Sequence, residues 1–517
     1  MARKSSGSGL PAKGPATRKR TTAASTRAST TTNKASKTAA DTTSKKRKPR
    51  DYEAGSESEH EQQRPAGDKR QKPSDGVPVK LKPSRQETKK AKITIQNDAP
   101  TRLLDVYVFG ANSCGELGMG AEYDEWECSR PTLNPLLSGA AVGVVQIATG
   151  GMHCAALTHD NEILTWGVND NGALGRDTTS EDKQSEDLNR KECTPTAIDT
   201  SGIAAGTRFT QVAAADSATF ALTEDGLVYG WGTFKEGNGG KSFSPTVKVQ
   251  STATLIPGLE KVTKLVTGTN HVLALTSNGT IFGWGVGEYS QLGREIIEQH
   301  KEKALLPKVV TRRKGFVDIA CGSEHCYAVH KDGKVYGWGL NNYGQTGISS
   351  GAGETKAIVP RPREIVGLQS CGNIACIDGG GFHGLAVTDQ GECLVWGRID
   401  NFATGLDVST LPESDILRDD RDKPRILKTP TPVPDVEAVF AAAGSEHNIA
   451  ITRDGKAYSW GFNDSYRTGI PSDDDIQVAR LIKSASVRDL RLVWAGASGR
   501  YGMVATEYSS ALPNGIS

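Results

Sequence analysis

Five histidines are the side chains in this sequence that could most readily move a proton or bind a metal at neutral pH. They occupy one position of a repeated segment and are His153, His271, His325, His383 and His447. No serine or cysteine nucleophile stands in a recognisable arrangement with them. Because the five lie in separate units rather than converging on one point, the pattern does not favour a metal site. We expect each ring to satisfy backbone groups at the same turn of its unit.

The cysteines and one glycine-rich segment indicate neither a zinc site nor a dinucleotide-binding loop. The nine cysteines are Cys114, Cys128, Cys154, Cys193, Cys321, Cys326, Cys371, Cys376 and Cys393. None forms Cys-x-x-Cys and their number is odd, which indicates buried, reduced thiols rather than a zinc site. The segment GGGFHG at 379–384 fits Gly-x-Gly-x-x-Gly, but no helix is expected after it, so it does not predict a dinucleotide loop. We expect neither an enzyme active site nor a cofactor.

A charge asymmetry divides the chain. Residues 1–92 hold 24 Lys and Arg against 9 Asp and Glu, a net charge of +15, and the remaining residues hold 38 against 51, a net charge of −13. The first stretch has few apolar side chains, so we predict a disordered tail. Its basic runs, TRKR with Arg18, Lys19 and Arg20, and KKRKPR with Lys45, Lys46, Arg47 and Lys48, suit an import receptor or a phosphate backbone.

No run of about 18 apolar residues and no apolar N-terminal region occur, so we expect neither a membrane span nor a secretory signal.

From residue 104 onward the sequence repeats itself, and the repeat predicts the elements that position all other side chains. The Trp-Gly step recurs at Trp166, Trp231, Trp284, Trp338, Trp396 and Trp460, and Phe109-Gly110 is its counterpart at the front. Asp-Gly and similar turns between β-rich runs precede the step, as in ALTEDGLVYGWG, and a Gly-x-Leu-Gly loop usually follows it. Each unit therefore predicts about four short antiparallel strands.

Six units are whole, and the seventh is split between the two ends of the chain. The front unit at 105–118 lacks its first two strands, and the segment 492–506 carries strands with no Trp-Gly step after them. We predict an all-β fold: a seven-bladed β-propeller over residues 93–510, closed by strands from both termini, with a C-terminal tail at 511–517.

The repeated pattern Gly-x-x-His, Ala-Leu-Thr, Gly-x-Val-Tyr-x-Trp-Gly and Gly-x-Leu-Gly resembles the regulator of chromosome condensation repeat, over about four fifths of the chain. A basic tail before a single propeller resembles the chromatin-bound member of that family, the guanine nucleotide exchange factor for the small GTPase Ran. The resemblance implies generation of Ran-GTP in the nucleus for nucleocytoplasmic transport and mitosis. It implies Ran, nucleosomal histones, DNA and an import receptor as partners, no membrane, no cofactor and a monomer.

The resemblance also implies a partner-binding site. The loop TFKEGNGGKSF at 233–243 departs from its neighbours and is similar to the family's β-wedge, the hairpin pushed into Ran near the nucleotide phosphates. The wedge maps to Phe234, Lys235, Glu236, Gly237, Asn238, Gly239, Gly240 and Lys241. Asp216 and His383 match an Asp and a His of the family's Ran-binding face, and Asn270 stands where the family often has Asp.

Other positions depart from the family pattern. Ser113 replaces an Asp, Ala218 breaks the histidine column, and Arg500 stands where the closing unit commonly has His. For the nucleosome, family members use a loop Arg, and the comparable segment 293–308 offers Arg294, Lys301 and Lys303 without a clear match. TRRKG at 311–315 is a second basic candidate.

Three alternatives stay open. The first is a chromatin-binding propeller scaffold without exchange activity, which the departures at Asn270 and Ser113 favour. The second is a light sensor similar to the plant ultraviolet-B photoreceptor, which would need clustered Trp beside Arg, whereas only Trp126 and Trp494 lie outside the Trp-Gly step. The third is an enzyme with an unrecognised active site.

Overall fold

The computed structural model of the protein describes residues 95–179 and 188–509. The chain divides into two units, residues 1–87 and 88–517. The predicted tail at 1–92, with both of its basic runs, and the predicted tail at 511–517 lie outside the described residues. Within the described part of the chain, no helix is long and apolar enough to cross a membrane.

Each repeat forms a four-stranded antiparallel sheet, because short β-rich runs alternate with tight turns. Sheet 2 contains β3 (Val144–Thr149), β4 (His153–Thr158), β5 (Ile163–Gly167) and β6 (Thr196–Ala197); sheet 3 contains β7 (Phe209–Ala214), β8 (Ala218–Thr223), β9 (Val228–Gly232) and β12 (Gln250–Leu255); sheet 4 contains β13 (Val262–Thr267), β14 (His271–Thr276), β15 (Ile281–Gly285) and β16 (Lys308–Val309); sheet 5 contains β17 (Phe316–Cys321), β18 (His325–His330), β19 (Val335–Leu340) and β20 (Ile358–Glu364).

The next two sheets share one long strand, β25 (Pro424–Ala443). Its first part pairs with β23 and its second part pairs with β26. Sheet 6 also contains β21 (Ile374–Gly379), β22 (His383–Thr388) and β23 (Glu392–Arg398), with β24 (Ile416–Arg418) beside β25, and sheet 7 also contains β26 (His447–Thr452), β27 (Ala457–Gly461) and β28 (Ile476–Leu481).

Sheet 1 combines the two ends of the described chain. It contains β1 (Leu104–Ala111), β2 (Glu127–Leu133), β29 (Leu492–Ala497) and β30 (Tyr501–Glu507), in the order β2-β1-β30-β29. Leu104 pairs with Glu507 and Gly110 pairs with Tyr501, so the strands predicted at 105–110 and 492–506 share one sheet.

Within the described residues, helical structure is limited to short segments in the connections, the longest being the kinked Glu298–Leu305. They are α1 (Arg190–Cys193) and seven 3-10 segments at Pro135–Leu137, Asp170–Gly172, Glu298–Leu305, Val366–Leu368, Val408–Thr410, Glu413–Asp415 and Asp464–Tyr466.

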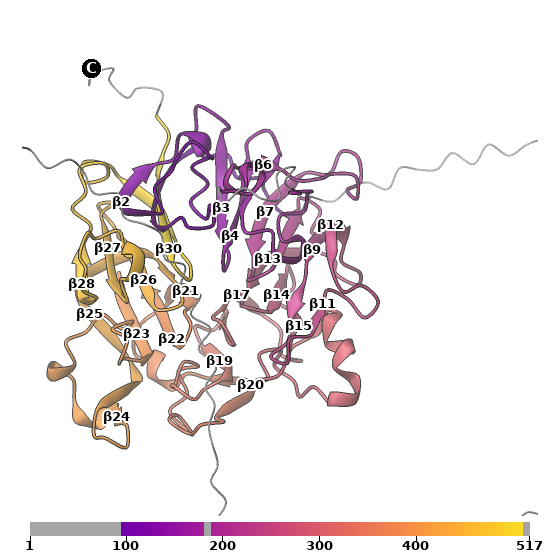
Figure 1. Ribbon diagram of the computed structural model, residues 1–517. Helices are drawn as coiled ribbons and strands as arrows, with labels where there is room; N and C mark the ends of the chain where they lie inside the picture. Colours follow the sequence, from indigo (N-terminus) through magenta and orange to yellow (C-terminus); the bar gives the residue numbers. More distant parts are fainter. Residues whose placement is uncertain (1–94, 180–187, 510–517) are drawn as a thin grey trace, which may run out of the picture. The chain divides into compact units, whose positions relative to one another are not determined.

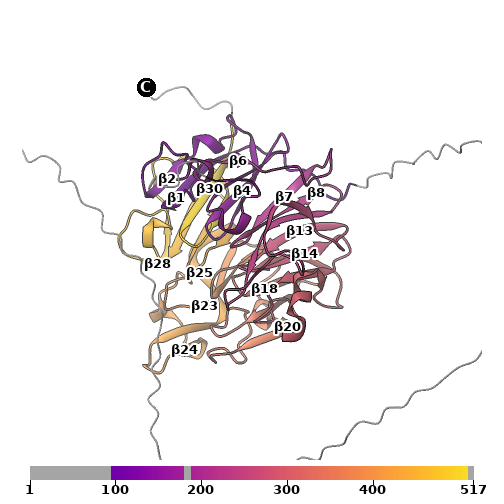
Figure 2. The ribbon, with the colours of Figure 1, turned by 45° about the vertical axis from the view of Figure 1, so that its right-hand side comes forward.

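The sheets follow one another in a ring (Figure 1), which is the arrangement of a β-propeller. A cavity at the centre of the ring marks a central channel. β7, β13 and β14, and then β18 succeed each other down one side of the domain (Figure 2). One strand from every sheet lines the channel, namely β3, β7, β13, β17, β21, β25 and β29, around a cavity of about 420 Å³.

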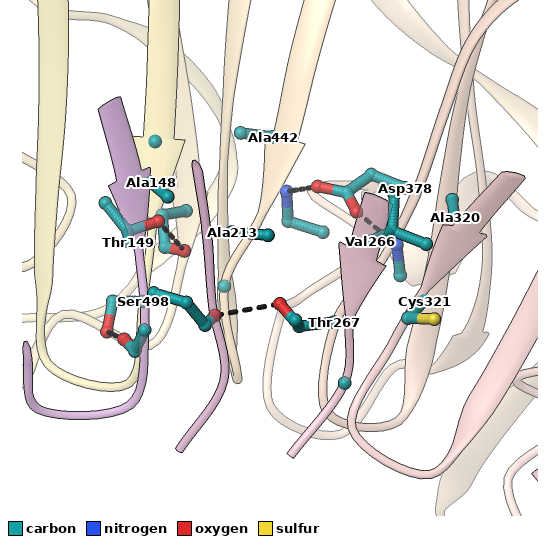
Figure 3. A pocket seen from close by; sticks show the side chains of 18 of the residues that line it. Ala148, Thr149, Ala213, Val266, Thr267, Ala320, Cys321, Asp378, Ala442 and Ser498 are labelled. Carbon is teal, nitrogen blue, oxygen red and sulfur yellow. Dashed lines mark hydrogen bonds between the residues drawn. The ribbon is translucent and has the colours of Figure 1, made fainter. Parts of the chain in front are cut away.

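Asp378 is a polar group on the channel wall. Its carboxylate accepts hydrogen bonds from the backbone N–H of Gly379 at 2.9 Å and of Ala443, on the neighbouring sheet, at 3.0 Å (Figure 3). Burial raises the pKa of Asp378 to about 7.

The second strand of each of sheets 2 to 7 is buried on both of its faces. Every residue of β4, β8, β14, β18, β22 and β26 is buried. These strands therefore lack the alternation of apolar and polar residues that a strand with one face in water shows.

The Trp-Gly steps join neighbouring sheets. The indole N–H of five tryptophans donates, over 2.8–3.0 Å, to a carbonyl in the loop of the preceding sheet: Trp166 to Glu116, Trp231 to Ala173, Trp338 to Gln291, Trp396 to Gln345 and Trp460 to Ala403. The last glycine of that loop packs closely against the indole at Gly118, Gly175 and Gly405. At Gly175, where φ is +65°, a Cβ would lie 2.7 Å from the Nε1 of Trp231, so only glycine fits.

The histidine column also joins neighbouring sheets. Nε2 of His153 lies 2.8 Å from Oγ1 of Thr219, that of His271 lies 3.1 Å from Sγ of Cys326, and that of His383 lies 2.9 Å from Oδ1 of Asn448. Each partner is the second residue of the second strand in the following sheet. For these three rings the expected bond to backbone groups of their own turn is wrong, because the partners of Nε2 are side chains of the next sheet. The rings of His325 and His447 have no hydrogen-bond partner among the described residues.

The closing sheet continues the column with a different residue from the one expected. Tyr501 pairs with Gly110 as His447 pairs with Gly461, so Tyr501, rather than Arg500, stands in the histidine position. Its hydroxyl lies 3.1 Å from Sγ of Cys154 in the following sheet. Ala218 interrupts the column, as expected.

Removing the C-terminal strands is predicted to destabilise every sheet. A chain ending at Asp489 loses β29 and β30 and leaves an edge of β1 unpaired, which exposes inter-sheet apolar surface. We expect a melting temperature lower by about 10 °C or more, or an insoluble protein. The control ends at Ser510 and keeps all the described strands, and equal melting of the two chains would contradict the role of this pairing.

The buried histidines predict a pH-dependent contribution to stability. Burial lowers the pKa of His383 to about 4, below the value of about 6.5 in an unfolded chain. Between these values the unfolded chain binds more protons, so the contribution of His383 is present above pH 6.5 and is lost as the pH falls to about 4. We expect the stability advantage of the wild type over His383→Asn, measured by urea unfolding, to shrink across this window.

The free energy of unfolding must be compared between the wild type and the variant at each pH, because buried carboxyls change the stability of the whole protein with pH in the opposite direction. Burial raises the pKa of Asp378 and of Glu324 to about 7, which favours the folded state as the pH falls. His159→Asn is the matched control, since the His159 side chain is 63% exposed. A difference between the wild type and His383→Asn that does not change with pH would contradict the assignment.

Candidate functional site

One end of the propeller carries the loops in which the repeats differ most. The turn between the first and second strands and the loop after each Trp-Gly step emerge at the same end, because successive strands run antiparallel. We call this end the Trp-Gly face. The predicted site residues Asp216 and Asn270 lie in its turns, and the loop 233–243 lies in its third sheet.

The loop 233–243 forms a hairpin. β10 (Phe234–Lys235) pairs with β11 (Lys241–Ser242), with Phe234 opposite Ser242 and Lys235 opposite Lys241. The N–H of Glu236 bonds to the carbonyl of Gly240 at 2.8 Å. A hairpin is therefore present where the sequence predicted the wedge, and the wedge assignment itself stays a prediction.

Stacked aromatic rings hold the base of this hairpin. Phe234 is 1% exposed, and its ring centroid lies 6.0 Å from that of Phe220 and 6.3 Å from that of Phe243. Trp284 packs edge to face on Phe220, with centroids 5.7 Å apart. Phe234 is thus a buried anchor, which corrects its assignment to the partner-binding surface.

Lys235 contacts three polar side chains of the site. Its Nζ bonds to the carboxylate of Asp170 in the second sheet and lies 3.6 Å from Oδ2 of Asp216. Its backbone N–H donates to Oδ1 of Asn270 at 2.7 Å. Burial lowers the pKa of Lys235, but the hydrogen bond to Asp170 and the charge of Asp216 outweigh it, so the pKa lies above its ordinary value.

Two predicted site residues therefore converge on the hairpin. Asp216 holds the side chain of Lys235 and Asn270 holds its backbone. The amide oxygen of Asn270 accepts the hydrogen bond that a carboxylate could accept, so the departure from Asp preserves this contact. The sequence did not single out Asp170, although its position just after the Trp166-Gly167 step placed it on the same face.

The tip of the hairpin is presented to solvent. Gly237, Asn238 and Gly239 are exposed. Either side of the tip is tethered: Glu236 pairs with Lys301 at 2.9 Å, and Nζ of Lys241 donates to Oδ1 of Asn171 at 2.8 Å. An exposed tip on a fixed base can enter a partner without the base having to reorganise.

His383 does not belong to this surface. It is fully buried, and its Nε2 faces Asn448. The prediction that His383 contacts a partner is contradicted by this burial, because no atom of the ring reaches the Trp-Gly face.

The basic candidates for nucleosome contact have different surroundings. Arg294 turns inward and donates to the carbonyl of Gly283 at 3.2 Å, and burial lowers its pKa to about 10. Lys301 is paired with Glu236. Lys303 and residues 312–314 are exposed, so among these candidates they are the ones open to a partner. Arg18, Lys19, Arg20 and the run Lys45 to Lys48 lie outside the described residues.

The chain resembles known proteins over most of the propeller. Residues 105–504 match the family model described as the RCC1-like domain. Protein pim1 of Schizosaccharomyces pombe is 38% identical over 79% of this chain and 75% of its own length. The guanine nucleotide exchange factor SRM1 of Saccharomyces cerevisiae is 36% identical over 77% of this chain and 86% of its own.

Solved structures agree with these relatives. Prp20p of Saccharomyces cerevisiae, whose structure was described with its binding to Gsp1p and histones, superimposes with a TM-score of 0.74 at 34% identity, over 80% of this chain and 93% of that one. Yeast RCC1 (Prp20) bound to Kap60 superimposes with a TM-score of 0.74 at 33% identity, over 84% of this chain and 97% of that one. The repeats, the propeller and these matches together show that the chain belongs to the family of RCC1-like domain proteins.

Proposed function

We propose that this protein is a guanine nucleotide exchange factor for a Ran-type small GTPase and that it acts on chromatin in the nucleus. The observation that carries the proposal is the hairpin of residues 234–242, anchored by Phe234 and Phe243 and held by the contacts of Lys235. The relatives support it, since SRM1 is named as an exchange factor and Prp20p was described with Gsp1p and histones.

An exchange factor breaks no bond of its substrate. It binds the nucleotide-free GTPase more tightly than the nucleotide-bound form, and by linkage it weakens nucleotide binding by the same factor. Such a protein needs a rigid face and a projecting element that disturbs the phosphate site. The ring of sheets supplies the first, and the tip at Gly237–Gly239 supplies the second.

The charge of the propeller suits this role. Residues 93–517 carry a net charge of −13, and Asp170 and Asp216 lie beside the hairpin on the Trp-Gly face. Carboxylates there can hold basic side chains of the GTPase once the nucleotide phosphates have left. The Mg²⁺ of the reaction belongs to the GTPase.

The basic segment 1–92 would direct the protein to the nucleus and to chromatin and would not take part in nucleotide exchange. We assign it binding to DNA and to an import receptor, in line with the complex of Prp20 with Kap60. Lys303 and residues 312–314 are candidates for a histone contact. A Trp-based light sensor has little support, because six of the eight Trp side chains are buried between sheets as structural contacts.

Shortening the hairpin tip tests the proposed wedge. Replacing Glu236–Gly240 with Asn-Gly keeps Lys235 opposite Lys241 in a two-residue turn and leaves the aromatic anchor in place. We expect GDP release from a Ran-type GTPase, followed with a fluorescent nucleotide, to slow by about tenfold or more, with nearly unchanged melting.

The matched control shortens another exposed hairpin tip, Asp419–Asp422 between β24 and β25, to Asn-Gly. It should leave release unchanged. If the tip variant accelerates GDP release from the GTPase as fast as the wild type does, the wedge assignment is wrong. If the wild-type protein does not accelerate GDP release at all, the result favours the chromatin-binding scaffold without exchange activity.

Deleting residues 1–92 tests whether the tail binds DNA while the propeller alone carries out nucleotide exchange. Exchange on free GTPase should remain within about twofold, whereas affinity for DNA should fall and lose most of its dependence on salt, because fewer counterions are released. Fluorescence anisotropy with duplex DNA at several salt concentrations measures this. Loss of exchange in the folded deletion variant would show that the tail takes part in the reaction.

A further inference from the structure

One imidazole nitrogen and two thiol sulfurs meet inside the wall between sheets 4 and 5. His271 begins β14, Cys321 ends β17 and Cys326 is the second residue of β18. Nε2 of His271 lies 3.1 Å from Sγ of Cys326, whose sulfur lies 3.8 Å from that of Cys321. All three ligand atoms lie within 4.8 Å of one another, and all three residues are buried.

Two features of the repeat bring the three residues together. Cys321 and Cys326 are register partners on adjacent strands, so their side chains start from opposite positions of one ladder. The histidine column then directs His271 at the second residue of the second strand in the following sheet, which is Cys326. Spacing along the sequence did not reveal the cluster, because the histidine comes from a different sheet.

The corresponding positions elsewhere lack this chemistry. His153 meets Thr219, whose register partner is Ala214, and His383 meets Asn448, whose register partner is Ala443. In the described part of the chain, His271, Cys321 and Cys326 form the one group of three or more His, Cys, Asp or Glu residues close enough to share an ion.

We propose that His271, Cys321 and Cys326 bind a thiophilic divalent cation of the zinc class, with two thiolates and one imidazole nitrogen as ligands. Zinc with sulfur ligands at 2.3 Å in tetrahedral geometry separates two sulfurs by about 3.8 Å, and the two cysteine sulfurs stand 3.8 Å apart. A nitrogen and a sulfur on such an ion lie about 3.5 Å apart, so the imidazole must withdraw by a few tenths of an ångström.

The central channel supplies the access that an ion needs. Cys321 is one of the residues on its wall (Figure 3), so an ion can enter from the channel and keep a water there as its fourth ligand. Binding releases the two thiol protons to solvent, while the imidazole binds in its neutral form. This proposal departs from the expectation that the sequence holds no zinc site.

Such an ion would add coordinate bonds between two sheets that are already joined by packing and by hydrogen bonds, such as the one from the Trp338 indole to the carbonyl of Gln291. His271 belongs to sheet 4 and both cysteines belong to sheet 5, so the coordinate bonds would cross the boundary between them. Binding to the folded state alone raises the stability of the propeller in proportion to the logarithm of the free ion concentration.

Cobalt(II) is the probe that tests the site. The full chain, with its nine cysteines kept reduced by a phosphine and stripped of metal, is titrated with Co²⁺. We expect a near-ultraviolet thiolate-to-cobalt band and intense visible bands of tetrahedral Co²⁺ that saturate at one ion per chain. Zinc should abolish these bands by displacing cobalt, and zinc should raise the melting temperature.

Variants assign the ligands. Cys321→Ser and Cys326→Ser should each weaken binding by more than about a hundredfold, since loss of a group that merely orients a ligand already costs ten- to a hundredfold. Cys376→Ser is the matched control, because Cys376 lies on the same channel wall in the next sheet, and it should bind cobalt like the wild type.

Two outcomes would overturn the proposal. One is the absence of the thiolate band in the wild type at excess Co²⁺, including the case in which the two cysteines are found as a disulfide that excludes the ion. The other is an unchanged band in the folded Cys321→Ser and Cys326→Ser variants. The wild-type titration decides the question even if a variant does not fold.

Discussion

The hydrogen bond from a tryptophan indole to a loop carbonyl of the preceding sheet is the contact on which this structure depends. Neighbouring sheets of the ring pack face to face, so each junction needs its own connection. The indole fills the space between two sheets and satisfies its N–H in the same step, as Trp231 does with the carbonyl of Ala173. The glycine that follows in the loop allows the close approach, because any side chain at Gly175 would strike the ring.

The hairpin of the third sheet lies where this contact is replaced. Its loop has no Gly-x-Leu-Gly sequence, and among the described hydrogen bonds none joins the Trp284 indole to that loop. Three stacked phenylalanines fill the space instead, and Trp284 packs against Phe220. The aromatic stack fills the space that the loop fills at the other junctions. Residues 236–240 are therefore not needed to pack against the next sheet, and they can project. The hairpin thus projects at one junction without opening the ring.

Repeated positions of the ring differ in chemistry although they share geometry. The histidine column faces a threonine, a cysteine or an asparagine of the next sheet, and Tyr501 takes the place of histidine in the closing sheet. Buried polar groups at such positions are costly unless they are paired. Four junctions supply such a pair, whereas the ring nitrogens of His325 and His447 have no hydrogen-bond partner among the described residues. One of these pairs, His271 with Cys326, gains a second thiol from Cys321, and there the same geometry can hold an ion.

The sequence by itself determined the strands, the hairpin turns, the pairing of both ends of the chain and the exceptional third loop. Each of these follows from local signals: β-rich runs and turn residues specify strands and hairpins over a few residues, and counting the units revealed the split one. Only the tertiary structure decided what the side chains meet. Lys235 finds Asp170 65 residues away, His383 turns into the wall, Arg294 folds inward and Tyr501 rather than Arg500 enters the column. These contacts join different sheets, and a local pattern specifies neither which sheet will be the neighbour nor on which side of a turn a side chain is buried.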